Sequence, residues 1–253
     1  MGSRYFTQWG AIEECEFNGR RYVFWPLLSD DGEVLADKGL IIVMATHNNG
    51  DRYFAIDALR KHKSASLLFV TDPDNSYYLG ANGRCSYEEL FDHCISLFDP
   101  KNVTFFGSSM AGYGALLHGV RLNCNVIASN PQINFEVTKE YCWPALRNTI
   151  SRLKECINLD DWMPDNYRDS AIHLIHGRNV LDVENIKCLI KADIRNRWMS
   201  ISSVDDDRHG FYINDFESVF QLHECLCAFR RISRFSPNER ALAKIARDGA
   251  LNT

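Results

Sequence analysis

The sequence has no long apolar segment and no surplus of positive charge. Its longest apolar runs, such as residues 40–45, are far shorter than the roughly 20 residues that a membrane-spanning helix requires. Its 28 Lys and Arg residues are outnumbered by 33 Asp and Glu residues, so the formal net charge is −5. Nucleic-acid-binding proteins usually carry a basic excess. We therefore expect no membrane span and no nucleic-acid partner, and the composition leaves the oligomeric state open.

The nine cysteines lack any Cys-x-x-Cys pair, and most lie in apolar segments, where a thiol packs like a small hydrophobic group. Only His223-x-Cys225-x-Cys227 resembles a metal site. On a helix Cys225 would face away from the other two side chains, so we predict a structural role there, no metal and no cofactor. No signal-like segment opens the chain. We expect nine reduced thiols in a cytoplasmic protein.

Apolar runs alternate with helical patterns along the chain, as in a doubly wound α/β protein. With 45% hydrophobic and 24% charged residues, the 253-residue chain has the composition of one globular domain, 1–253. The runs that predict buried strands are residues 39–45, 66–70, 103–106, 126–128, 172–175 and 198–204. Helical patterns occupy residues 53–61, 86–98, 111–122, 183–192 and 215–231, and a last helix is expected after Ser236-Pro237. This alternation predicts a mostly parallel central sheet with helices on both faces.

Two segments depart from this alternation. Residues 13–17 and 21–25 flank Asn18-Gly19, a favoured two-residue turn, and predict an N-terminal antiparallel hairpin. Residues 130–169 are too long for an ordinary crossover and are rich in aromatic side chains, Trp143 among them. We expect one helix near 144–157 in this insertion, which we interpret as a lid or cap.

The strongest chemical signal lies where the third apolar run ends. Phe106-Gly107-Ser108-Ser109-Met110-Ala111 passes from a strand through small residues directly into a helix, as a nucleophile elbow does. The sharp turn requires small residues two positions before and two after the nucleophile. Gly107 and Ala111 meet this requirement for Ser109, whereas Ser108 would place Phe106 at a restricted position. We therefore predict Ser109 as the nucleophile.

A serine nucleophile needs a base and an acid, which in this arrangement follow it in the order acid, histidine. His209 lies in a glycine-containing loop after the last predicted strand. Asp182 follows the His-Gly at the end of the fifth strand, although it comes five residues after that glycine rather than the common three. The alternatives are that Glu184 or another carboxylate is the acid, or that Asp182 only caps a helix.

Other loops leave the same edge of the predicted sheet. The N–H of Met110 would face a developing oxyanion, and the backbone of His47 or Asn48 would supply a second donor. The predicted substrate-binding residues on this edge and in the insertion are Tyr77, Tyr78, Gln132 and Trp143.

Over about residues 13–233 the chain resembles an α/β-hydrolase. The features that carry this resemblance are the elbow 107–112, the late acid near Asp182 and His209-Gly210-Phe211. The resemblance implies an eight-stranded, mostly parallel sheet and a Ser–acid–His triad. The elbow and the Asn-Pro-Gln that follows the next strand are also similar to small hydrolase-like proteins of bacterial surface-glycan assembly, which implies O-acyl groups on sugars.

These observations predict a serine hydrolase that cleaves an ester or related acyl bond of a small molecule or glycan. An O-acyltransferase with the same triad is the first alternative, because the acceptor depends on pocket shape and water access rather than on the triad. A non-catalytic binding protein on a hydrolase scaffold is the second.

Overall fold

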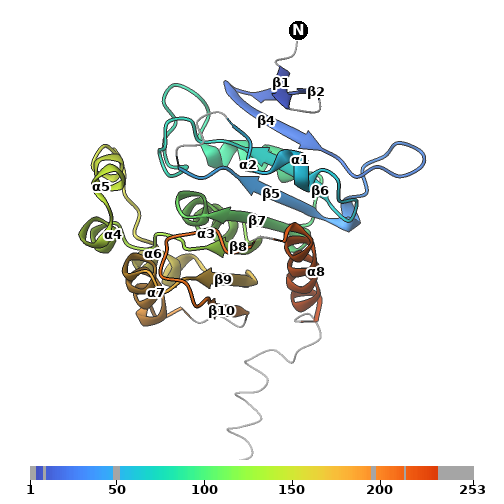
Figure 1. The fold of residues 1–253 in the computed structure, drawn as a ribbon. Helices are drawn as coiled ribbons and strands as arrows, with labels where there is room; N and C mark the ends of the chain where they lie inside the picture. Colours follow the sequence, from blue (N-terminus) through green and yellow to red (C-terminus); the bar gives the residue numbers. More distant parts are fainter. Residues whose placement is uncertain (1–3, 8–9, 48–51, 195–197, 214, 233–253) are drawn as a thin grey trace, which may run out of the picture.

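The computed structural model describes residues 4–7, 10–47, 52–194, 198–213 and 215–232 (Figure 1). Within these ranges the central sheet contains eight strands in the order β10-β9-β8-β7-β5-β6-β4-β3. Their bounds are β3 (Cys15–Phe17), β4 (Arg20–Trp25), β5 (Leu40–Met44), β6 (Ser66–Val70), β7 (Val103–Ser108), β8 (Asn125–Ser129), β9 (Ile172–His176) and β10 (Met199–Ser203). Neighbouring strands from β10 through β6 are parallel, while β4 pairs antiparallel with both β6 and β3. The mostly parallel sheet with an antiparallel N-terminal hairpin is thus confirmed.

The helices and a small separate sheet surround this core. The helices are α1 (Ile56–Leu59), α2 (Tyr87–Ile95), α3 (Met110–Arg121), α4 (Phe135–Tyr141), α5 (Pro144–Ile150), α6 (Leu159–Asn166), α7 (Val180–Lys191) and α8 (Phe216–Ile232), with 3₁₀ turns η1 (Ala36–Lys38) and η2 (Pro100–Asn102). A second antiparallel pair, β1 (Arg4–Thr7) and β2 (Gly10–Glu13), precedes the central sheet and was not anticipated from the sequence.

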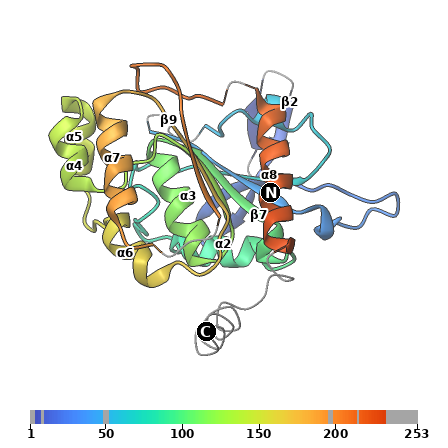
Figure 2. The same cartoon turned by 90° about the horizontal axis from the view of Figure 1, so that it is seen from below.

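The alternation of side chains along β5 explains why both faces of the sheet are covered. Leu40, Ile42 and Met44 contribute to one apolar core, together with residues of α2, α3 and α7. Ile41 and Val43 contribute to the other, with residues of α1 and α8. Figure 2 shows α8 on the opposite side of the sheet from α3 and α7. A strand covered on both faces is apolar at every position, which is why the run 40–44 does not alternate with polar residues.

Local chemistry accounts for several element boundaries. Asn18 and Gly19 have φ values of 45° and 83°, as the predicted hairpin turn requires. Ser86 accepts from the Glu89 N–H while the Glu89 carboxylate accepts from the Ser86 N–H, a complete capping box that starts α2. The last predicted helix, after Ser236, lies outside the described residues.

Three expectations about individual elements are wrong. The helix expected at 53–61 is only the single turn of α1, since Ala55 before it is left-handed with φ 50°. The 198–204 run forms β10, but four of its five residues are exposed because β10 is the edge strand of the sheet. The insertion 130–169 holds three helices, α4, α5 and α6, rather than one. The extended backbone of Cys142 ends α4, and Trp143, extended before a proline, lets Pro144 open α5.

Six of the nine cysteines are buried or half-buried, and the other three, Cys15, Cys156 and Cys225, are exposed. All nine cysteines are free. His223 is buried, its Nδ1 lies 2.7 Å from Thr104 Oγ1, and Cys225 is exposed on the other side of α8. Among the residues that the structure describes, no three His, Cys, Asp or Glu side chains are grouped to hold a metal ion. No helix in the described ranges is long and apolar enough to cross a membrane.

Candidate active site

The turn between β7 and α3 has the geometry of a nucleophile elbow. Ser109 has φ 55° and ψ −121°, a strained conformation that a residue with a side chain rarely adopts. The turn is tied to its neighbours, since Ser109 N–H donates to Ser129 O at 2.8 Å and Thr46 Oγ1 donates to Ser108 O at 2.9 Å. Ser108 is the last residue of β7. The strained position is therefore Ser109 and not its neighbour.

The small residues around Ser109 are required by the tightness of this turn. A Cβ on Gly107 would lie 2.9 Å from Ala111 Cβ and still closer to the Ala111 carbonyl oxygen. A Cβ on Gly112 would lie 3.1 Å from Ser129 O. Met110 is buried and opens α3, so its N–H is one of the helix-terminal amides with no acceptor inside the helix.

His209 bridges Ser109 and Asp182. Its Nε2 lies 2.9 Å from Ser109 Oγ, and its Nδ1 lies 2.5 Å from Asp182 Oδ1. The Asp182 side chain is 1% exposed and the His209 side chain 14% exposed, so both charges of an imidazolium–carboxylate pair would be shielded from water. Three residues from distant parts of the chain thus converge at the carboxyl edge of the sheet.

The structure explains why the carboxylate that contacts His209 comes five residues after Gly177. The helix α7 begins at Val180, capped by the Asn179 side chain, so Asp182 lies within its first turn rather than capping it. Glu184 is directed elsewhere and pairs with Lys187 at 2.6 Å. A Cβ on Gly177 would collide with the Tyr212 hydroxyl, because the loop that carries His209 packs directly on the loop before α7.

The loop after β8 contacts the loops that carry Ser109 and His209 and the loop before α7. Asn130 has φ 45°; its Oδ1 accepts from the Gly177 N–H at 3.1 Å and its Nδ2 donates to the Gly210 carbonyl. The amide of Gln132, which is 1% exposed, donates from Nε2 to Ser109 Oγ at 3.2 Å. The expectation that Gln132 lies at this edge holds, whereas the bracing role of Asn130 was missed. The available signal in the sequence was an Asn directly after a predicted strand, because Asn adopts the positive φ seen here more readily than most residues.

The helix α5 touches the site at two points. The Trp143 ring at its start lies 5.4 Å from the His209 ring, and the Trp143 residue is 43% exposed. Near its end, Thr149 Oγ1 lies 3.0 Å from His47 Nε2. His47 is half-buried, and this burial lowers its pKa. The predicted neighbour Asn48 lies outside the described residues.

The prediction that Tyr77 and Tyr78 bind substrate is wrong, because both side chains are buried. Tyr77 is 0% and Tyr78 1% exposed, so neither ring is available to a ligand. Tyr78 donates its hydroxyl to Ala45 O at 2.7 Å, and the Tyr77 ring packs against Phe135. Below them Asp72 is buried, which raises its pKa, and its carboxylate accepts from the Tyr78 N–H at 3.0 Å. These tyrosines hold the loop after β6 in place.

Solved structures resemble this architecture, although no protein-family model and no curated protein sequence match the chain. MGS-MChE2, an alpha/beta hydrolase enzyme from a metagenome of lagoon sediments in Morocco, matches with a TM-score of 0.53 and 15% identity over 87% of this chain and 99% of its own. The chain has the α/β-hydrolase fold.

Two further structures share the α/β-hydrolase fold with this chain. The capsule O-acetyltransferase of Neisseria meningitidis serogroup A matches with a TM-score of 0.59 and 18% identity, over 86% of this chain and 94% of its own. The S-formylglutathione hydrolase FrmB of Staphylococcus aureus matches with a TM-score of 0.53 and 14% identity, over 90% and 98%. At such identities the likeness establishes the fold, which hosts several chemistries.

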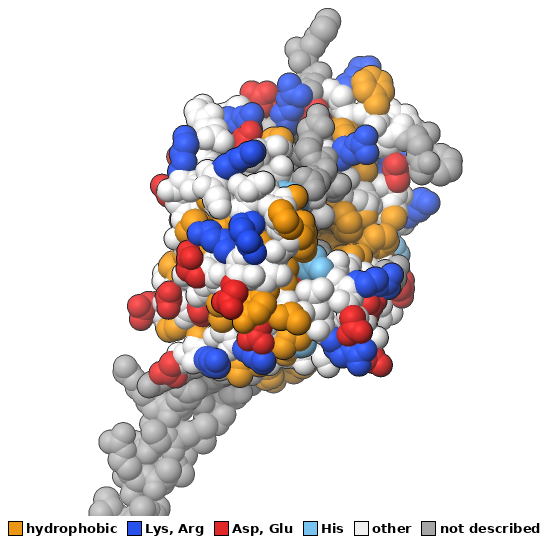
Figure 3. Space-filling model, turned by 60° about the vertical axis from the view of Figure 1, so that its left-hand side comes forward, with side chains coloured by type: hydrophobic (Ala, Val, Ile, Leu, Met, Phe, Trp, Pro, Cys, Tyr) orange, Lys and Arg blue, Asp and Glu red, His pale blue; other side chains and the backbone are white. Residues whose placement is uncertain are grey.

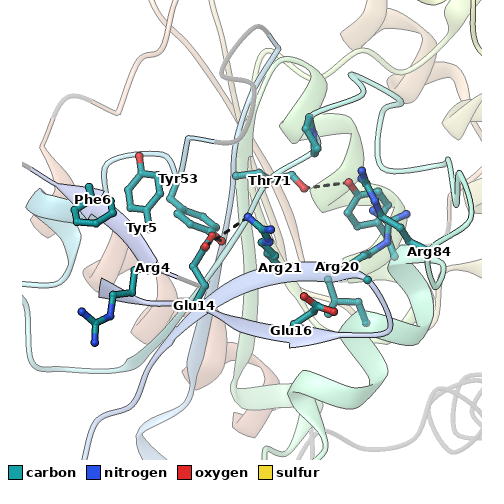
Figure 4. Close-up of a pocket in the computed structure, with 14 residues that line it drawn as sticks. Arg4, Tyr5, Phe6, Glu14, Glu16, Arg20, Arg21, Tyr53, Thr71 and Arg84 are labelled. Carbon is teal, nitrogen blue, oxygen red and sulfur yellow. Dashed lines mark hydrogen bonds and ion pairs between the residues drawn. The ribbon is translucent and has the colours of Figure 1, made fainter. Parts of the chain in front are cut away.

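Two cavities lie beside the loop that follows β6 in this α/β-hydrolase fold. One, of about 660 Å³, is lined by residues 74–76, 79–83, 86, 149 and 152–155, so it adjoins the Thr149–His47 contact. The other, of about 600 Å³, lies against the N-terminal strands (Figure 4). Its charged lining residues are Arg4, Arg20, Arg21, Arg84, Glu14 and Glu16. Neither lining includes Ser109, Asp182 or His209.

The surface around the site mixes apolar and charged groups. Figure 3 brings the α4–α5 side of the molecule forward and shows hydrophobic side chains gathered between interspersed acidic and basic ones. Tyr141 and Trp143 are each 43% exposed, and Val180 at the start of α7 is 57% exposed. No single sign of charge dominates the face shown there.

Proposed function

We propose that this protein is a serine hydrolase that cleaves an ester or related acyl bond of a small molecule or glycan through an acyl-enzyme on Ser109. The observation that supports it is His209, which contacts Ser109 Oγ at 2.9 Å and Asp182 Oδ1 at 2.5 Å. A nucleophile, a base and an orienting carboxylate within hydrogen-bonding reach of one another form the minimal set for acyl transfer through serine.

In the proposed acylation step, His209 Nε2 accepts the proton of Ser109 Oγ as this oxygen attacks the carbonyl carbon. Asp182 accepts from His209 Nδ1–H, which holds the imidazole in the required tautomer and stabilises the imidazolium. The Met110 N–H at the start of α3 donates to the oxyanion, and the backbone of His47 supplies a second donor. His209 then returns the proton to the leaving group, and a water molecule activated by the same imidazole hydrolyses the acyl-enzyme.

An O-acyltransferase is the second candidate. The observation that favours it is the likeness, over 86% of this chain, to a protein whose name assigns it O-acetyl transfer to a capsule. The chemistry up to the acyl-enzyme is the same. The two functions differ in whether water or an acceptor hydroxyl group, such as that of a sugar, reaches the ester at Ser109 first.

We propose that the insertion 130–169 forms a wall of the substrate pocket within a single domain. Its helix α5 contacts the catalytic histidine through Trp143 and the loop after β5 through Thr149. Trp143 is placed to contact substrate next to His209. The nine free cysteines favour a reducing compartment, so we propose a cytoplasmic location.

A fluorophosphonate probe tests the proposal. The wild-type protein should become covalently labelled at Ser109, as mapped by mass spectrometry of the modified peptide, and Ser109→Ala should not be labelled. Ser108→Ala is the matched control, because it removes the adjacent hydroxyl and should leave labelling intact. Failure of the wild type to react would favour a non-catalytic binding protein.

The second step separates hydrolysis from transfer. An activated acetyl ester supplied with and without sugar acceptors distinguishes the two by its products. Release of acetate at a rate independent of the acceptor indicates the hydrolase. An acetylated sugar that forms at the expense of free acetate indicates the acyltransferase.

A further inference from the structure

Gln132 lies against the nucleophile, yet the mechanism above gives its amide no task. Its Nε2 donates to Ser109 Oγ at 3.2 Å. Its Oε1 is buried and has no hydrogen-bond partner among the described residues. In a purely structural role, a buried amide is normally paired at both of its ends, because an unpaired buried acceptor costs stability. An amide that is half-paired and directed at a reacting atom indicates a functional role.

The backbone on both sides of Gln132 is fixed. Pro131 packs on the first turn of α3, where a Cβ on Gly112 would lie 3.3 Å from it. The Ile133 N–H donates at 2.6 Å to Oδ1 of Asn185, a fully buried residue of α7. The side chain therefore reaches Ser109 from a rigid support that connects the nucleophile's helix to the acid's helix. A donor held in this way does not have to reorganise during the reaction.

We propose that Gln132 is a further catalytic residue, a side-chain donor that moves from Ser109 Oγ to the oxyanion as the tetrahedral intermediate forms; this inference rests on the proposed function. In the resting protein, Ser109 Oγ donates to His209 and accepts from Gln132. Once Oγ is bonded to the acyl carbon, it is an ester-like oxygen and a poor acceptor. The negative charge then lies on the oxygen attached to that same carbon, within reach of the released N–H.

This transfer of a hydrogen bond is selective for the transition state. The ground-state bond to Oγ is long at 3.2 Å, whereas a bond to an oxyanion is charge-assisted and shorter. An interaction that strengthens only as charge develops raises kcat without tightening substrate binding. The Gln132 amide would then add a side-chain donor from the loop after β8 to the two proposed backbone donors, the Met110 N–H and the backbone of His47.

The test compares Gln132→Leu and Gln132→Met with the wild-type protein in fluorophosphonate labelling and in hydrolysis of an activated acetyl ester. Gln132→Leu has no donor, and Gln132→Met keeps nearly the length of the glutamine side chain without its N–H. Both variants should lower the labelling rate and kcat by about 10² or more, the usual effect of losing one oxyanion donor, with little change in KM. The melting temperature of Gln132→Leu should be unchanged or raised, because an unpaired buried oxygen is removed.

Asn125→Leu is the matched control. Asn125 is also fully buried with an unpaired Oδ1, but it lies at the opposite, amino end of the same strand β8. This variant should lower the melting temperature, since Asn125 Nδ2 donates to Lys101 O, and leave kcat at its wild-type value.

The outcomes separate this inference from the proposed function. A wild-type protein that is not labelled overturns both. A labelled wild type with Gln132→Leu or Gln132→Met at the same rate overturns only the role of Gln132. A loss of activity in Gln132→Leu that merely follows a loss of folded protein assigns the residue to packing and also overturns the inference.

Discussion

Replacement of Asp182 by Asn tests whether the negative charge of Asp182 stabilises the His209 imidazolium during the proposed reaction. The substitution keeps the size and shape of the side chain but removes its negative charge. Asp182 is 1% exposed at its side chain, and its Oδ1 lies 2.5 Å from His209 Nδ1. The imidazolium that forms when Ser109 attacks would therefore lose its shielded counter-charge.

The size of the loss follows from this geometry. Two unit charges about 4 Å apart at an effective dielectric constant near 20 attract one another by about 4 kcal/mol. At 1.36 kcal/mol per tenfold in rate, the variant should lose about 10³ in kcat. The asparagine can also hold the imidazole in the wrong tautomer, which adds to the loss.

The assay is the rate of hydrolysis of an activated acetyl ester, with the melting temperature followed in parallel. Glu184→Gln is the matched control, because Glu184 lies in the same helix and was the alternative acid from the sequence, but pairs with Lys187. It should retain wild-type kcat. A fully active Asp182→Asn together with an inactive Glu184→Gln would refute the assignment of the acid.

Three further predictions test the surroundings of the triad. Trp143→Ala should raise KM for an ester substrate by about fivefold, corresponding to about 1 kcal/mol of lost aromatic contact beside the site, with a smaller change in kcat; an unchanged KM would place the substrate elsewhere. Gly107→Ala should abolish labelling of Ser109, since its Cβ would collide with Ala111, whereas Ala111→Gly should still be labelled. Burial lowers the pKa of His118 from 6.5 to about 3, so below pH 6.5 only the unfolded chain takes up this proton, and His118 should account for a loss of about 2 kcal/mol of stability from neutral pH to pH 5. Buried His223, whose pKa is lowered to about 4, adds to the loss over the same range, so in urea unfolding His118→Gln should make the pH dependence shallower by about 2 kcal/mol without abolishing it.

The central strands and the elbow could be predicted because their physical requirements are local. The run 40–44 is apolar at every position because helices cover both faces of β5, so burial alone marks it as a strand. Gly107 and Ala111 are small because the tight turn brings these two residues, only four positions apart, into direct contact. Ser86 and Glu89 cap α2 through bonds to each other's backbone. In each case the residues that create the structure are neighbours in the chain.

Burial and long-range contacts could not be predicted in the same way, because they depend on residues that are distant in the sequence. A Tyr77-Tyr78 pair in a polar loop after a strand has the composition of a binding surface, but both rings are fully buried. Whether a ring is exposed depends on what packs against it, and for Tyr77 this includes Phe135 from the insertion. The run 198–204 was expected to form a buried strand, yet β10 within it is exposed at four of its five residues and lies at the edge of the sheet that the described residues form.

The sequence by itself determined the order of the candidate catalytic residues: a serine on a tight turn of small residues, a later carboxylate and a last histidine along an alternating α/β chain. It left Asp182 and Glu184 as alternatives, because they are two residues apart and differ only in the direction that a helix gives them. The tertiary structure directs Asp182 to His209 and Glu184 to Lys187. It also decided that Gln132 meets Ser109 and that Asn130 connects the acid loop to the histidine loop. Parallel strands end at one edge of the sheet, so side chains far apart in sequence meet there at distances that only the folded packing sets.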